Sequence, residues 1–246
     1  ANGTIVTASA QEHPDLYWAL RGGTGGNFGV VLQVTYRMQR LDQVWAWAIS
    51  WDAVHATQVL TLMQAGYMKT GAPDALGYMM NLGFQNGVPV YMVQGMFCGS
   101  REDGLAAIAP LMAIPSAQLL VDKTGTYPDM NVWLEDHPYT LPDNLPDGIA
   151  ETKASGYINT QLSPADWQRI IDYFKTSPNP WSLAYLEPYG GAINRYPMAD
   201  SAFVHRNVDA DLVVDVFWRN PAERAQMEAW LDGFMQLVRP LSLIHI

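Results

Sequence analysis

The sequence is poor in several residue types, and each scarcity excludes a class of structure or partner. Its single cysteine, Cys98, excludes an internal disulfide and a cysteine-rich metal site, and its place in an apolar run predicts a small core residue. The chain has 14 Lys and Arg residues against 24 Asp and Glu, and a net charge of −10. This balance argues against a nucleic-acid partner, because phosphate binding needs clustered basic side chains. No apolar run approaches the ~20 residues of a membrane-spanning helix, so no membrane segment is expected.

The chain of 246 residues is 49% hydrophobic and 15% charged, enough to bury one large core or two smaller ones. Its most distinctive stretch is DLYWALRGGTGGNFGVVLQVTYRM, residues 15–38, where Gly22, Gly23, Gly25 and Gly26 are followed by Gly29. Glycine has no Cβ, so such a cluster either packs a helix tightly against a strand or lets the backbone approach a ligand.

The cluster differs from the fingerprint of dinucleotide-binding Rossmann folds. That fingerprint places glycines at i, i+2 and i+5 between a strand and a helix. Counting from Gly23 and Gly25, the third position is Phe28. The expected elements also come in the reverse order, with a helix that Asp15 can cap, then the turn, then an alternating strand over 30–36. The pattern therefore argues against a site of the NAD type.

Three stretches together resemble one family. They are residues 1–38, YLEPYGGAINR at 185–195, and DSAFVHRN at 200–207. In this order they are similar to FAD-linked oxidases of the vanillyl-alcohol oxidase (PCMH-type) superfamily, and most of all to its berberine-bridge-enzyme-like branch. The resemblance implies an FAD-dependent oxidoreductase that passes a hydride from a sugar, alkaloid or polyketide-type small molecule to the flavin and then to oxygen. It also implies which residues line the FAD: Gly25, Gly26, Asn27, Gly29, Val30 and Val31.

The resemblance also divides the chain. It implies that residues 1–40 are the C-terminal end of an FAD-binding domain and that residues 41–240 are a truncated substrate domain. Residues 241–246 resemble translated adapter sequence and are expected to be a non-native tail. On this interpretation the chain is a fragment that lacks both the phosphate-binding part and the extreme C-terminus, and it is expected to be inactive in isolation.

The hydrophobic pattern predicts an α+β fold with an antiparallel sheet backed by helices, because strand runs are bracketed by helices without regular βαβ alternation. Asn86-Gly87 between two alternating runs predicts a hairpin. Ser163-Pro164 predicts a helix start. Residues 127–153 lack periodicity and are expected to form a functional or poorly ordered loop. The expected strands are 44–51, 76–84, 88–98, 181–187, 202–206 and 211–218.

Candidate site residues follow from the chemistry that the resemblance implies. Removing a hydride from a C–H bond requires a base for the accompanying proton. Residues of one strand parity share a face, so Tyr185, Glu187 and Tyr189 are expected to converge with Asp215 on a common pocket. Glu187 is the first choice for the base and Asp215 the second, with Tyr189 as a further catalytic candidate. Tyr185 and His205 are expected to contact substrate.

Each assignment has a plainer alternative. The carboxylates also fit an ordinary strand surface, the tyrosines fit half-buried sheet aromatics, and His205 fits a buried histidine that hydrogen-bonds beside a structural Arg206. In the plant branch the base matches Val213, which cannot ionise, and other branches use a tyrosine from the C-terminal segment. A non-catalytic flavin-fold protein that binds a ligand is the alternative function, and an unrelated α+β interaction module is a third. No metal site is expected, and the cellular compartment stays open.

Overall fold

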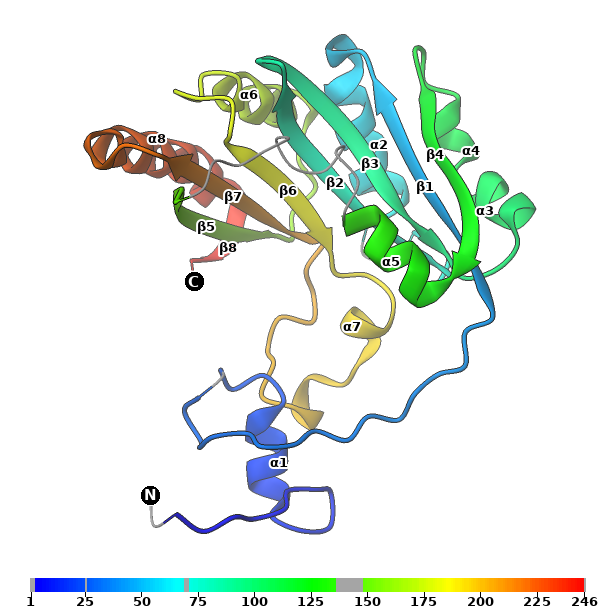
Figure 1. Cartoon of the computed structure of the whole chain (residues 1–246), viewed down its shortest axis with the longest axis vertical. Helices are drawn as coiled ribbons and strands as arrows, with labels where there is room; N and C mark the ends of the chain where they lie inside the picture. The colour runs from blue at the N-terminus through cyan, green and yellow to red at the C-terminus, as the bar shows by residue number, and fades with distance from the viewer. Residues whose placement is uncertain (1–2, 25, 69–70, 136–147, 246) are drawn as a thin grey trace.

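The structure is a computed structural model that describes residues 3–24, 26–68, 71–135 and 148–245. Its centre is an eight-stranded antiparallel sheet with the strand order β4-β1-β3-β2-β6-β7-β5-β8 (Figure 1). The strands are β1 Gln43–Trp51, β2 Leu76–Gln85, β3 Val88–Phe97, β4 Gln118–Thr126, β5 Ala150–Ile158, β6 Leu183–Pro188, β7 Ala210–Trp218 and β8 Ser242–His245. The α+β class with an antiparallel sheet, predicted from the pattern, is confirmed.

Helices cover both faces of the sheet unequally. The main layer, α2, α6 and α8, packs on one face over the larger hydrophobic core, whereas α5 covers only the part of the other face formed by β1 and β4 (Figure 1). The helices are α1 Pro14–Leu20, α2 Ala56–Gly66, α3 Arg101–Ala107, α4 Ala109–Met112, α5 Tyr127–Glu135, α6 Pro164–Phe174, α7 Ala192–Arg195 and α8 Arg224–Val238. The rest of the second face, over β6, β7 and β5, lies away from this helix layer.

Strand β1 shows how the alternation builds two cores. Its residues Trp45, Trp47 and Ile49 point into the large core under the main helix layer. Val44 and Ala46, one position out of phase, point into the small core under α5. Successive side chains of a strand point to opposite faces, so one nine-residue strand serves both layers.

Two local signals produced the predicted elements. The β2–β3 hairpin turns at Asn86 and Gly87, whose φ angles are 52° and 75°. A two-residue turn that matches the twist of the strands requires positive φ at both positions. Helix α6 starts with a capping box, in which the Ser163 side chain accepts from the Asp166 N–H and the Asp166 side chain accepts from the Ser163 N–H.

The N-terminal segment lies outside both cores. Among the described residues the first buried one is Val44, and α1 buries no residue. In Figure 1 this segment runs below the sheet, beside α7. The domain boundary expected near residue 40 stays a prediction. At the other end, residues 242–245 of the expected tail form β8 beside β5, and Ile246 lies outside the described residues.

Several local predictions were wrong. Residues 30–36 and 202–206 form no strand, because neither segment has a neighbouring strand to pair with, and alternation without a partner cannot make a ladder. Helix α1 begins at Pro14 after a left-handed His13, so Asp15 lies in its first turn and does not cap it. Cys98 is exposed, because it follows the last residue of β3 and its side chain lies outside the core.

The region predicted as one long loop, residues 127–153, contains regular structure at both ends. It includes α5 and the start of β5, and residues 136–147 lie outside the described part of the chain. The sequence did not reveal β5 because its outward side chains over residues 150–156 are polar and its inward ones are small, and only Tyr157 and Ile158 at its end are large and hydrophobic.

Candidate functional site

The candidate site lies on the face of β5, β6 and β7 that points away from the main helix layer. We call this surface the carboxylate face. On β6 and β7, Leu186 and Leu212 pair in register and point into the helix-covered core, which turns the residues of opposite parity outward. The carboxylate face comprises Lys153, Ser155 and Tyr157 of β5, Tyr185 and Glu187 of β6, and Asp211, Val213 and Asp215 of β7.

The strand register fixes which of these residues are neighbours. Tyr185 pairs with Val213, and Glu187 pairs with Asp211, across the β6–β7 ladder. On the other side of β7, Lys153 pairs with Asp215. Tyr185, Glu187 and Asp215 therefore share one face, as their parity suggests, and Asp211 joins them directly opposite Glu187. Their catalytic and binding roles remain predictions.

Asp211 and Asp215 are unusually buried for carboxylates. They are 8% and 6% exposed, and one carboxylate oxygen of each finds no hydrogen-bond partner in the described part of the chain. Burial raises the pKa of Asp211 to about 6, an effect that Ser155 opposes by hydrogen bonding and that the charge of Glu187 reinforces. Burial likewise raises the pKa of Asp215 to about 6, against the attraction of Lys153. Carboxylates with such values are ionised at neutral pH but accept protons more readily than surface aspartates.

The two predicted tyrosines are also perturbed. Burial, followed by the charge of Asp215, raises the pKa of Tyr185 to about 12. Burial and a hydrogen bond with Tyr157 raise the pKa of Tyr189. Both phenols therefore stay protonated at neutral pH and can donate hydrogen bonds on the carboxylate face.

An aromatic cluster joins Tyr189 to His205. The Tyr189 ring lies 5.3 Å from that of Tyr157 and 6.1 Å from that of Phe203, and the His205 ring lies 4.4 Å from that of Tyr157. The Tyr189 N–H donates to the Asp209 carbonyl just before β7, which holds Tyr189 beside the strand. Tyr157 is central to this cluster. Sequence reasoning missed it because it lies on β5, a strand that the sequence pattern did not predict.

The same cluster reaches the glycine-rich segment through the loop 196–206. The Trp18 indole N–H donates to the Ala199 carbonyl at 2.7 Å, and Arg21 donates to the Tyr196 hydroxyl at 2.6 Å. A Cβ at Gly22 would lie only 2.5 Å from the Phe203 nitrogen, so this glycine allows the close approach of two backbones. The segment 14–24 is thus docked onto the loop that carries Phe203 and His205.

The glycines of the cluster divide into two groups. Gly22 and Gly23 pack against residues 202–203 and the end of α1, as the tight-turn alternative expects. Gly26 and Gly29 have φ of 85° and 133°, and a Cβ at either position would meet no atom within 4 Å. Gly25 lies outside the described residues.

The rest of the predicted FAD contacts follow that exposed turn. Asn27 donates a hydrogen bond to Thr24, Val30 is 86% exposed and Val31 is 56% exposed. A bare backbone turn followed by exposed aliphatic side chains fits contact with a flat, largely apolar ring system. The residues present are therefore compatible with a flavin along residues 26–31.

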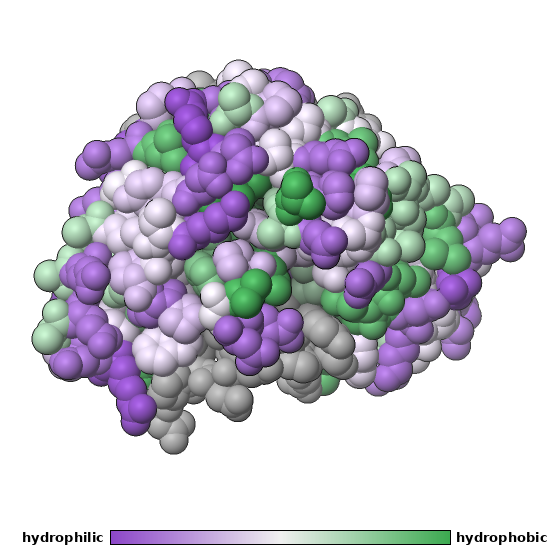
Figure 2. Space-filling model, turned by 90° about the horizontal axis from the view of Figure 1, so that it is seen from above, coloured by the Kyte–Doolittle hydropathy of each residue, from purple (hydrophilic) through white to green (hydrophobic). Residues whose placement is uncertain are grey.

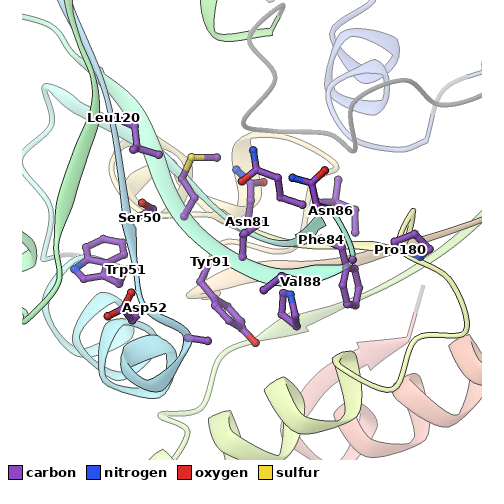
Figure 3. A pocket seen from close by; sticks show the side chains of 18 of the residues that line it. Ser50, Trp51, Asp52, Asn81, Phe84, Asn86, Val88, Tyr91, Leu120 and Pro180 are labelled. Atoms are coloured by element: carbon purple, nitrogen blue, oxygen red, sulfur yellow. The ribbon is translucent and has the colours of Figure 1, made fainter.

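The larger of the two main cavities lies elsewhere. It measures about 610 Å³ and surrounds the end of the β2–β3 hairpin, at the top of Figure 1. Figure 2 shows the molecule from this side, and hydrophobic and hydrophilic residues are interspersed on the face it shows. Figure 3 shows Leu120 on one side of the sheet and Tyr91 on the other, so its lining belongs to both faces. None of the predicted site residues lines it. The second cavity, of about 430 Å³, includes Glu187.

Two kinds of feature are absent from the described residues. No helix there is both long and apolar enough to cross a bilayer. Over the same residues, no three His, Cys, Asp or Glu side chains are grouped so that they could hold a metal ion.

Comparisons with known proteins agree with the motifs. No protein-family model matches the chain. An uncharacterised FAD-linked oxidoreductase of Bacillus subtilis is 23% identical over 93% of this chain and 49% of its own length. A xylooligosaccharide oxidase of Thermothelomyces thermophilus is 25% identical over 86% of this chain and 44% of its own length. The structure superposes on the wild-type BBE-like 1 protein of Physcomitrella patens with a TM-score of 0.84 at 23% identity, over 98% of this chain and 53% of the other.

The chain spans about half the length of the curated relatives it matches. Several of its sequence relatives carry the name FAD-linked oxidoreductase, and its fold neighbours include BBE-like proteins. The chain is therefore a homologue of the FAD-linked oxidoreductases, with the fold of the BBE-like enzymes.

Proposed function

We propose that this chain forms the substrate side of an FAD-dependent oxidase that acts on a small molecule. Residues 1–40 would be the end of the FAD-binding domain and residues 41–240 the substrate domain, with the carboxylate face turned toward the flavin. The observation that carries the proposal is the pair of buried aspartates on a face that continues, through Tyr189 and Phe203, to the packed glycine Gly22, four residues before the exposed turn that begins at Gly26.

The chemistry divides between cofactor and protein. FAD, when bound along residues 26–31, would supply the acceptor for a hydride from the substrate C–H bond, and oxygen would be the final acceptor. The protein must take the proton that leaves the neighbouring hydroxyl or amine as the new double bond forms. A carboxylate within hydrogen-bond reach does this, and its own protonation then balances the charge.

Glu187 is the first candidate for this base and Asp215 the second. Glu187 is only partly buried at the end of β6, where it lines the smaller cavity and can meet a substrate. Asp215 has the raised pKa but lies deeper, beside Tyr185. The phenols of Tyr185 and Tyr189 would orient the substrate by hydrogen bonds, and the His205 ring would add an aromatic contact.

The substrate class is proposed from the names of the relatives. Curated relatives include a xylooligosaccharide oxidase and a chitooligosaccharide oxidase, and one fold neighbour is described as a pollen allergen with glucose dehydrogenase activity. A sugar is therefore the first probe to try, followed by amines and phenolic polyketides. All are neutral or cationic near pH 7, which suits a face with more acidic than basic groups.

The test is anaerobic flavin reduction in the FAD-loaded enzyme that contains residues 1–246. Xylobiose, glucose, a tertiary amine and a phenol would each be mixed with wild type and with Glu187→Gln, Asp215→Asn and Glu228→Gln. The last is a matched control, because Glu228 lies on α8 and pairs with Arg224. Loss of the base should slow reduction by ~10²-fold or more, while the control keeps its rate.

Two outcomes would contradict the proposal. If a probe reduces the flavin equally fast in all variants, neither carboxylate is the base. If FAD is bound but no probe reduces it, the non-catalytic ligand-binding alternative is favoured.

A further inference from the structure

The cavity that contains Glu187 is formed by two segments far apart in the sequence. One wall comes from the end of α2 and residues 72–79, and the other from residues 187–192 at the end of β6 and the start of α7. Its volume of about 430 Å³ lies within the range of small-molecule sites. Its position at the end of β6 places it next to the carboxylate face, with Glu187 shared by both.

The walls of the cavity are mainly apolar and aromatic. Leu76, Met79 and Pro188 contribute aliphatic surface, and the rings of Tyr67 and Tyr78 meet edge to face at 6.1 Å. The Tyr67 hydroxyl donates to the Ala107 carbonyl at 2.9 Å, which fixes that ring. By strand parity Tyr78 points to the helix-covered face and Met79 to the face of Glu187, so the cavity extends around the end of the sheet. Its apolar walls on both faces favour the apolar body of a ligand.

The charged groups of the cavity are acidic. Glu187 and Asp74 line it, and the described lining includes no Lys, Arg or His. Asp74 is already paired, because Arg195 donates to both of its carboxylate oxygens at 2.8 Å. This pair joins α7 to the segment 72–74 and so connects the two walls. The carboxylate of Glu187 is left to meet a ligand.

We infer that this cavity is a binding subsite for an apolar ring that carries a hydrogen-bond donor, either a neutral hydroxyl or a protonated amine, which faces Glu187. An anionic group is disfavoured there because it would meet the carboxylate. The inference rests on the proposed function only in assigning the ring to the non-reacting part of the substrate. Binding energy from such a part holds the reacting carbon in place over the carboxylate face.

The test uses the chain 1–246 without flavin, labelled with 13C at its methionine methyls. The Met79 signal, assigned with Met79→Leu, reports on the cavity, and the Met198 signal is the control, because Met198 is 56% exposed and outside the lining. The probes are phenethylamine, 2-phenylethanol and phenylacetate at pH 7.5. The dissociation constants of the amine and the alcohol, obtained from the shift of the Met79 signal, should be at least ~10-fold lower than that of phenylacetate. The Met198 signal should not move.

Two variants check where the probes bind. Ala192→Trp adds a large side chain at the cavity wall and should abolish the Met79 shifts, whereas Ala222→Trp, at another exposed helix start, should leave them intact. Glu187→Gln should weaken the amine more than the alcohol. No Met79 shift with any probe, or tightest binding of phenylacetate, would overturn the inference. Because no flavin chemistry is measured, these outcomes are independent of the kinetic test of the proposed function.

Discussion

Replacing Asp215 by Asn is expected to stabilise the folded chain at neutral pH. Asp215 is 6% exposed on β7, and one of its oxygens has no partner in the described part of the chain. Burial raises its pKa to about 6 from 3.8, so folding favours the protonated form. Asn has nearly the same shape, carries no charge and can keep a hydrogen bond with Tyr185.

The size and sign of the effect follow from proton linkage. Between pH 4 and 6 the folded state binds a proton at Asp215 that the unfolded state has already lost. The free energy of unfolding therefore falls as the pH rises through this window. A pKa difference of about two units corresponds to about 3 kcal/mol by pH 7. Lys153, which attracts Asp215, loses that interaction in the variant, so the expected gain is about 1 to 3 kcal/mol.

The assay is urea denaturation of wild type and Asp215→Asn at pH 4 and pH 7.5, with Asp42→Asn as control. Asp42 is highly exposed and pairs only loosely with Arg40, so its replacement should change little at either pH. The gain of Asp215→Asn should be present at pH 7.5 and absent at pH 4. A variant that is less stable than wild type at pH 7.5, or a difference that does not grow with pH, would refute the reasoning.

Two further predictions concern contacts that hold the site in place. Gln64→Leu should cost about 3 kcal/mol of unfolding free energy in urea melts, because the buried Gln64 amide donates to Asp209 at 2.9 Å and also bonds three other groups; a loss below about 1 kcal/mol would contradict this. Gly22→Ala should speed amide hydrogen exchange in α1, because a Cβ there would collide with Phe203. Gly3→Ala is the control, because Gly3 also has positive φ but lies in open space, and it should leave the exchange unchanged. Equal exchange rates in the two variants would count against docking of this segment.

The location of the candidate site on one sheet face could be predicted because parity is a local property. Tyr185 and Glu187 are two residues apart, so any strand that contains both must point them the same way. The same argument applies within β7 to Asp211 and Asp215. The hydrophobic residues of the other parity are buried in the helix-covered core, so these polar residues face away from it.

The pairing of β6 with β7 was beyond a local argument. That Glu187 faces Asp211, and not Asp215, depends on the register between strands more than twenty residues apart in the chain. Burial of the two aspartates, and with it their raised pKa, depends in turn on what packs around the finished sheet. Tyr157 shows the same limit, because β5 has weak alternation and becomes a strand by pairing along the whole of β7 and, at its end, with β8.

The glycine-rich segment divides in the same way. Its sequence by itself determined a helix, a tight turn and a need for glycine, since left-handed backbone at Gly26 and Gly29 is a property of single residues. Only the tertiary structure decided which glycines serve packing and which stay exposed, because Gly22 meets Phe203 from 181 positions further along the chain. It also decided that residues 30–36 stay unpaired, since a strand exists only where a partner supplies its hydrogen bonds.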